Sequence, residues 1–122
     1  MNLDRYTQKA QEALVQSQQI AQEMDHQAIE PAHLLLALLR QPEGVVPAVV
    51  TKLSGSTEGL LKEITGALEK QPKITGSGLG EVGLSRSAAD VLSAAERYAR
   101  GMQDDYVSTE HLLLALTESS EG

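Results

Sequence analysis

The sequence contains no cysteine, phenylalanine or tryptophan, and its only aromatic residues besides histidine are three tyrosines. Without cysteine, neither disulfides nor thiol chemistry can contribute, so a reducing cytoplasm is the expected compartment. The interior must be built from leucine, valine, isoleucine, alanine and methionine. The 122 residues suit one domain, large enough to remove roughly two-thirds of its unfolded surface from water.

Positive charge is also scarce, and no apolar run is long. Lysine and arginine total 10 against 17 aspartate and glutamate residues, which gives a net charge of −7. Nucleic-acid binding depends largely on neutralising phosphates, so the charge argues against a DNA or RNA partner. The longest apolar run, 34–39, is far too short to span a bilayer, and the N-terminus has no export pattern. We expect a soluble protein with no membrane partner.

A repeat is the main feature that the sequence does contain. The hexapeptide HLLLAL occurs at 33–38 and again at 111–116, an offset of 78 residues. The segment before each copy has apolar positions spaced i, i+3, i+4, i+7, which is typical of an amphipathic helix, and HLLLAL itself predicts a buried helix. The chain is therefore an internal duplication of a helical lobe. The matching positions are Ala10, Ala13, Leu14, Ser17, Ile20, Ala21 and Met24, then Ala88, Val91, Leu92, Ala95, Tyr98, Ala99 and Met102.

Capping residues, prolines and glycines divide the chain into six expected helices. They run from Thr7 to about Met24, over 31–40, from Pro47 to the break at 54–56, over 60–68 before Pro72, from Ser85 to about Gly101, and from Ser108 to about Glu118.

These helices predict lobe one over 1–73, a glycine-rich linker over 74–83 and lobe two over 84–122. The linker lacks the Gly-Lys-Ser/Thr ending of a phosphate-binding loop, so we interpret it as a plain connection. The counterparts of the third and fourth helices would fall beyond residue 122, so lobe two is expected to be truncated. The leucines of its HLLLAL helix then need cover from lobe one or from a second copy, or the helix is locally loose.

Three histidines are the candidates for catalysis or metal binding. Catalysis would pair a serine or threonine with His26, His33 or His111 and a group that orients the imidazole. A metal site would need more ligands than the two repeat-related histidines provide. We favour a structural role, in which each first-turn ring bonds nearby backbone or side chains, and we expect no metal.

Two further features could contribute to binding. Asp104, Asp105 and Glu110 cluster around the turn before the last helix, either as a solvated, capped turn or as an acidic rim that attracts basic or partly unfolded peptides. Tyr98 lies on an apolar helical stripe, where core packing is favoured and a groove wall is the alternative.

The segments LDRYTQKAQEAL, IEPAHLLLALL, PKITG and VSTEHLLLAL together resemble the N-terminal repeat domain of Clp AAA+ unfoldases, most closely the ClpB disaggregase type. The resemblance implies an all-α, pseudo-twofold domain of two four-helix lobes. It implies a non-catalytic module that captures unfolded or aggregated polypeptide. The alternative is docking of adaptor proteins, as in ClpA and ClpC types. ATP and Mg²⁺ would bind only in ATPase domains of a hexameric parent, since no Walker motif is present here.

The resemblance also implies which residues form the binding region. Thr7, Ser85, Asp104 and Glu110 would form its polar rim, and Ala94, Tyr98 and His111 would line its groove. In the ClpC type of this family, both lobes contain a Thr-Glu-His motif. Here lobe two has it at 109–111, but lobe one has Pro-Ala-His at 31–33, which favours the disaggregase type.

Overall fold

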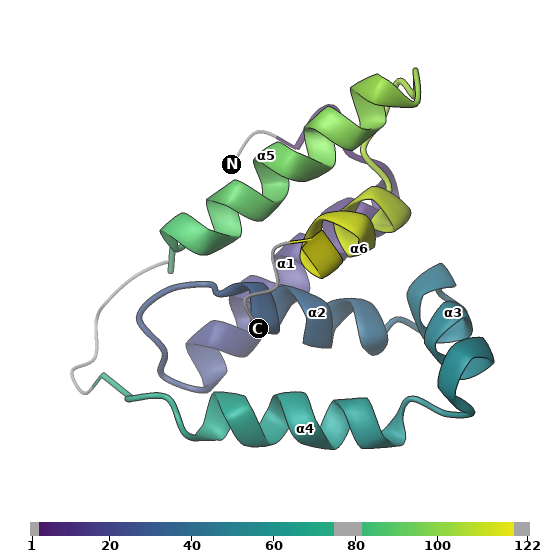
Figure 1. The fold of residues 1–122 in the computed structure, drawn as a ribbon. Coiled ribbons are helices and arrows are strands. Elements are labelled where there is room, and N and C mark those ends of the chain that lie inside the picture. Colours follow the sequence, from purple (N-terminus) through teal and green to yellow (C-terminus); the bar gives the residue numbers. More distant parts are fainter. Residues whose placement is uncertain (1–2, 75–81, 119–122) are drawn as a thin grey trace.

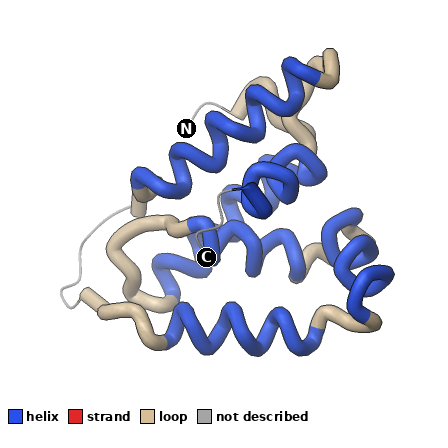
Figure 2. Tube along the Cα trace, viewed as in Figure 1, coloured by secondary structure: helices blue, strands red, loops and turns tan. Residues whose placement is uncertain are grey.

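The computed structural model describes residues 3–74 and 82–118, and these residues form six α-helices and two isolated β-bridges (Figures 1 and 2). The predicted all-α class and the four helices of lobe one are confirmed. The helices are α1 (Gln8–Glu23), α2 (Pro31–Leu39), α3 (Val45–Ser54), α4 (Glu58–Glu69), α5 (Arg86–Gly101) and α6 (Thr109–Glu118).

The long helices α1 and α5 begin and end in the same way, as a duplication predicts. The Thr7 hydroxyl accepts a hydrogen bond from the Ala10 N–H (3.2 Å), and the Ser85 hydroxyl accepts one from the Ala88 N–H (3.0 Å). At the other ends, Asp25 and Gln103 both adopt φ 60°. This left-handed conformation costs an ordinary residue roughly 1 to 2 kcal/mol. In both lobes it turns the chain away from the helix at the same repeat position.

Two predicted boundaries need correction. Helix α3 begins at Val45, two residues before Pro47. The proline lies in the first turn, where its missing N–H would have had no helical partner anyway. Helix α2 ends at Leu39, and Arg40 is its C-cap. Gly55 ends α3 at φ 90°, the region that glycine adopts readily.

The core is centred on α2, which packs against α1, α3, α4, α5 and α6. Helix α5 packs mainly on α6, and α3 of lobe one reaches across to α6 as well. One hydrophobic cluster therefore extends through both lobes. Within the described part of the chain, no helix is long and apolar enough to cross a bilayer.

The two lobes exchange short main-chain contacts in a reciprocal manner. The Thr7 N–H donates to the Val107 carbonyl (2.9 Å), and the Val107 N–H donates to the Arg5 carbonyl (2.8 Å). The repeat-related pair is Ser85 N–H to the Ile29 carbonyl (3.0 Å) and Ile29 N–H to the Gly83 carbonyl (2.8 Å). The start of α1 is thus fastened to the start of α6, and the start of α5 to the start of α2.

Of the predicted linker over 74–83, residues 75–81 lie outside the described part, and the flanking residues pair with lobe one. The Ile74 N–H donates to the Asp25 carbonyl (2.9 Å). Val82 is buried, and its carbonyl accepts from the Gln18 side chain (3.0 Å). Both described ends are thus hydrogen-bonded to lobe one.

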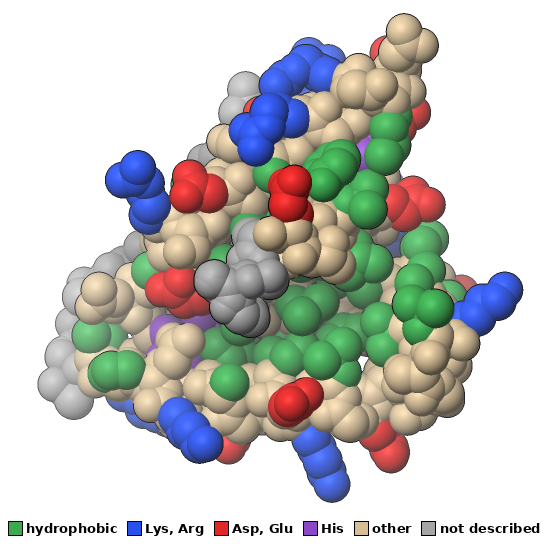
Figure 3. All heavy atoms as spheres, viewed as in Figure 1, with side chains coloured by type: hydrophobic (Ala, Val, Ile, Leu, Met, Phe, Trp, Pro, Cys, Tyr) green, Lys and Arg blue, Asp and Glu red, His purple; other side chains and the backbone are tan. Residues whose placement is uncertain are grey.

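Helix α6 is less enclosed than α2. Leu112 is fully buried, Leu113 and Leu116 are partly buried, and Leu114 is 38% exposed. Lobe one supplies part of the cover through α1, α2 and α3. Hydrophobic side chains gather on the face between α6 and α4 (Figure 3). The self-association that could cover this face stays a prediction.

Candidate functional site

A histidine at the third position caps both α2 and α6. The Glu30 N–H donates to His33 Nδ1 (2.8 Å), and the Ser108 N–H donates to His111 Nδ1 (2.8 Å). A nitrogen that accepts from a main-chain N–H carries no proton, so each ring is neutral with its proton on Nε2. The structural role predicted for both histidines is confirmed.

The two rings donate to different partners at the same repeat position. His33 Nε2–H donates to His26 Nδ1 (2.8 Å), whereas His111 Nε2–H donates to Asp104 Oδ2 (2.9 Å). Both partners lie seven residues before their histidine. His26 is only 2% exposed, but the Asp104 side chain is 51% exposed. Lobe two therefore presents a charged group at a position that lobe one buries.

Burial, together with repulsion from His26, lowers the pKa of His33 from 6.5 to about 4. Burial disfavours the charged imidazolium, and the ring nitrogen that would take the extra proton already accepts the Glu30 N–H. Nε2 of His26 is buried and has no hydrogen-bond partner in the described structure. The two rings are therefore buried together, and burial disfavours the charged form of His33.

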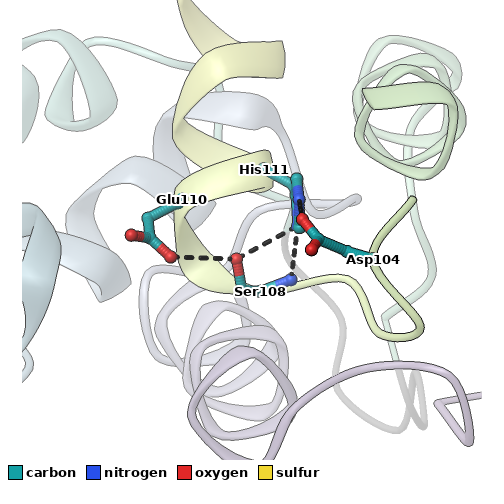
Figure 4. A network of polar contacts seen from close by, with 4 residues as sticks. All are labelled: Asp104, Ser108, Glu110 and His111. Carbon is teal, nitrogen blue, oxygen red and sulfur yellow. Dashed lines mark hydrogen bonds and ion pairs between the residues drawn. The ribbon is translucent and has the colours of Figure 1, made fainter. Parts of the chain in front are cut away.

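In lobe two, Ser108, His111 and Asp104 form a hydrogen-bonded series like that of a serine hydrolase (Figure 4). The Ser108 hydroxyl lies 3.0 Å from His111 Nδ1, and Asp104 bonds the opposite ring nitrogen. However, the single lone pair of Nδ1 already accepts the Ser108 N–H at 2.8 Å. His111 is not free to take the hydroxyl proton as a general base must, so the geometry is that of a helix cap.

Metal binding has no better support in the structure. The described residues contain no group of three or more histidine, aspartate or glutamate side chains that could hold an ion.

An exposed acidic cluster surrounds this cap. Asp104, Asp105 and Glu110 are exposed, and we call these three residues the acidic turn. The Ser108 hydroxyl donates to Glu110 Oε1 (3.3 Å), so this hydroxyl contacts the Glu110 and His111 side chains. Glu110 and Asp104 lie on opposite sides of Ser108 (Figure 4).

A groove of about 320 Å³ lies between α5 and the end of α6. We call it the α5 groove. Met102, at one end of α5, is 50% exposed and is followed two residues later by Asp104 of the acidic turn. Partial burial and the nearby Glu118 carboxylate raise the pKa of Tyr98 above its usual value. The groove thus combines apolar side chains with charged ones. Its lining residues are Ala94, Arg97, Tyr98, Gly101, Met102 and Glu118.

The structure brings most, but not all, of the predicted site residues together. Ala94 and Tyr98 line the α5 groove. Tyr98 also packs partly against the core, so both of its interpretations apply in part. Asp104 and Glu110 belong to the acidic turn, and Thr7 is joined to its base through Val107.

Two predicted site residues lie elsewhere. Ser85 caps α5 beside Ile29, at the repeat-related end of the molecule. His111, which was predicted to line the groove, is placed away from the wall of the α5 groove. Its ring is only 4% exposed, because Ser108 and Asp104 hold it under the turn, and it is absent from the groove wall.

Sequence reasoning missed Arg97, Met102 and Glu118 as groove residues. Met102 was assigned to the buried stripe because it matches Met24, which is partly buried against the core. The available signal was its neighbourhood: Met102 directly follows Gly101 at the end of α5 and precedes a run of polar residues. An apolar side chain in such a segment is poorly covered.

Comparison with known proteins decides the family. The family model described as the Clp repeat (R) N-terminal domain matches residues 5–122, nearly the whole chain. The chain belongs to this family. The Clp N-terminal domain assignment agrees with the resemblance found in the repeated segments.

Individual relatives support the same conclusion. The chaperone protein ClpB of Bacillus cereus (strain ATCC 10987 / NRS 248) is 36% identical over 120 residues, which cover 97% of this chain but 14% of that protein. The N-terminal domain (1-163) of the ClpV1 ATPase from E. coli EAEC Sci1 T6SS superposes with a TM-score of 0.84 at 28% identity. That match covers 96% of this chain and 70% of the other.

A further solved structure, described as "Peptide from EAEC T6SS Sci1 SciI protein", has the same fold. It matches with a TM-score of 0.84 at 28% identity, covering 95% of this chain and 72% of that one. This chain therefore spans about one-seventh of the length of the ClpB relative that it matches.

Proposed function

We propose that this Clp N-terminal domain captures unfolded or aggregated polypeptide for an ATP-dependent disaggregase of the ClpB type. The observation that carries the proposal is the α5 groove, which combines apolar and charged side chains and includes Met102, two residues before Asp104 of the acidic turn. Such a surface suits extended segments that combine apolar and basic side chains, because the apolar groups lose water and the carboxylates attract the cations.

The divergence between the repeats supports this assignment. At the position of Asp104, lobe one has the buried His26, and at the position of Glu110 it has Ala32. Both lobes nevertheless keep the same histidine cap. Glu110 is therefore not needed for the cap, which leaves it available for binding, and the Asp104 side chain is 51% exposed although it also bonds His111.

The parent protein would be a hexameric AAA+ ring in the cytoplasm, with ATP and Mg²⁺ bound in domains outside this chain. The domain itself would be non-catalytic. Docking of an adaptor protein, as in ClpA and ClpC types, is the alternative function. It would use a folded partner instead of an extended one, so the two functions differ in the ligand that they require.

Two synthetic peptides test the proposal directly. Both are extended 15-residue chains of leucine, serine and glycine, one carrying four arginines and the other four glutamates at the same positions. We expect the arginine peptide to bind with a Kd in the micromolar range or weaker, about −8 kcal/mol or less in magnitude, because a flexible ligand must be ordered on a shallow surface. The glutamate peptide should bind more weakly. Equal binding of both peptides, or no binding of either, would contradict the proposal.

Variants then locate the site. Tyr98→Ala and Glu110→Ala should each lower the affinity for the arginine peptide by about three- to tenfold. This range corresponds to the loss of a contact of about 1 kcal/mol. Glu110→Ala reproduces the alanine that lobe one has at this position, so the fold should be retained. Glu63→Ala removes an exposed carboxylate from α4 and serves as the matched control, with unchanged affinity.

A further inference from the structure

Tyr6 lies between the two residues that join the N-terminal segment to lobe two. Arg5 and Thr7 exchange main-chain hydrogen bonds with Val107, and Val107 directly precedes Ser108 of the α6 cap. The Tyr6 ring is only 5% exposed. The N-terminal segment therefore forms the support on which the acidic turn rests.

The Tyr6 hydroxyl also connects this segment to α5. It donates to Glu96 Oε2 at 2.8 Å. Glu96 lies on α5, but on the face that lines a second recess with Asp104 and Asp105, not on the face of the α5 groove. Burial, with the Glu96 carboxylate beside it, raises the pKa of the Tyr6 hydroxyl well above its usual value, so the group remains a donor. One hydrogen bond thus links the base of the acidic turn to the helix that carries the groove.

The repeat provides an internal comparison for this hydrogen bond. At the other junction, Leu84 occupies the position of Tyr6 and Gln18 occupies that of Glu96. The main-chain pairing is nevertheless the same, from Gly83 and Ser85 to Ile29. There Gln18 bonds the Val82 carbonyl instead of a side chain. An apolar residue is therefore sufficient for the junction itself, and the phenol–carboxylate bond occurs only where the acidic turn is attached.

We propose that the Tyr6–Glu96 hydrogen bond is a positioning element, which fixes the acidic turn relative to the α5 groove so that both can contact one extended peptide. The inference rests on the proposed function, since the peptide is the ligand named there. In this inference Tyr6 and Glu96 act by holding the acidic turn and α5 in place relative to each other.

Three single variants, and the double variant that combines Tyr6→Phe with Glu96→Ala, test the inference with the arginine peptide described above. Tyr6→Phe keeps the ring and removes the hydroxyl, and Glu96→Ala removes the acceptor. Each should lower the affinity for the peptide by about two- to tenfold, which is the effect of one lost hydrogen bond. Glu96→Gln keeps an acceptor oxygen and should bind like wild type. The double variant should be no weaker than either single one, because both remove the same bond.

The repeat also supplies the matched control. Gln18→Ala removes the corresponding contact of lobe one, and we expect the affinity for the peptide to stay unchanged. If the Tyr6 hydrogen bond had a purely structural role, Tyr6→Phe and Gln18→Ala would have the same effect on the affinity for the peptide. Thermal unfolding of each variant separates loss of binding from loss of folding.

Amide NMR spectra without peptide separate this inference from the proposed function. Tyr6→Phe should shift the amides of Val107, Ser108 and Glu110, and Glu96→Gln should leave them near their wild-type positions. If wild type binds the peptide but Tyr6→Phe binds equally well, or if the two single losses add in the double variant, the inference is wrong. If wild type does not bind, the proposed function fails. The positioning then stands only if the amides of the turn shift as described, and falls if they do not.

Discussion

Acidification should destabilise this domain through the buried imidazole of His33. The pKa of His33 is lowered from 6.5 in the unfolded chain to about 4 in the fold. Between these values the unfolded chain binds more protons, so the free energy of unfolding falls as the pH falls from about 6.5 towards 4. The contribution of neutral His33 to the free energy of unfolding is fully present above pH 6.5. Because His33 is completely buried, solvent screening reduces the effect little.

The two pKa values set the size of the loss. Between pH 7 and pH 5 it amounts to about 2 kcal/mol for one histidine, a large part of the 5 to 15 kcal/mol that typically stabilises a domain. Urea unfolding followed by helical circular dichroism at pH 7, 6 and 5 measures it.

The matched variant is His33→Gln. Glutamine at the third helical position can still accept the Glu30 N–H, as in a capping box, but it does not titrate. We expect its free energy of unfolding to change much less between pH 7 and pH 5 than that of wild type. A pH dependence that is the same in both proteins would show that His33 is not held neutral by burial.

The remaining predictions concern caps, strain and association. Thr7→Ala and Ser85→Ala should each cost about 1 kcal/mol in urea unfolding, but only Thr7→Ala should weaken peptide binding, so equal binding losses would contradict the site. Gln103→Gly should raise the free energy of unfolding by up to about 1 kcal/mol by relieving the φ of 60°, and a decrease would show that this backbone is unstrained. Sedimentation velocity should detect self-association that Leu114→Glu abolishes, or hydrogen exchange should show α6 less protected than α2. A monomer with both helices equally protected would refute that expectation.

Much of this fold is predictable because its signals are local and occur twice. The offset of 78 residues, the caps at Thr7 and Ser85 and the apolar stripes of α1 and α5 each predict an element that the structure contains. The α3 boundary was harder to place, since a proline in the first helical turn gives no sign of whether it is the first or the third residue.

The candidate site was less predictable because it depends on contacts between residues that are distant in sequence. The pairing of Thr7 with Val107 and of Ser85 with Ile29 involves isolated bridges, which leave no periodic pattern. Sequence reasoning therefore grouped Ser85 with Thr7, although the fold separates their junctions. His111 was assigned to the groove from the family resemblance alone, whereas its position in the first helical turn predicted the bonds to backbone and side chains that the structure contains.

The most direct test of the proposed function is a titration of isotope-labelled protein with the arginine peptide, observed by amide NMR. We predict that the largest shifts fall on the α5 groove, especially Ala94, Tyr98 and Met102, and on the acidic turn at Asp104 and Glu110. The amides of α4 should hardly move. Shifts confined to α3 and α4, or an unchanged spectrum at millimolar peptide, would contradict the assignment of peptide capture to this surface.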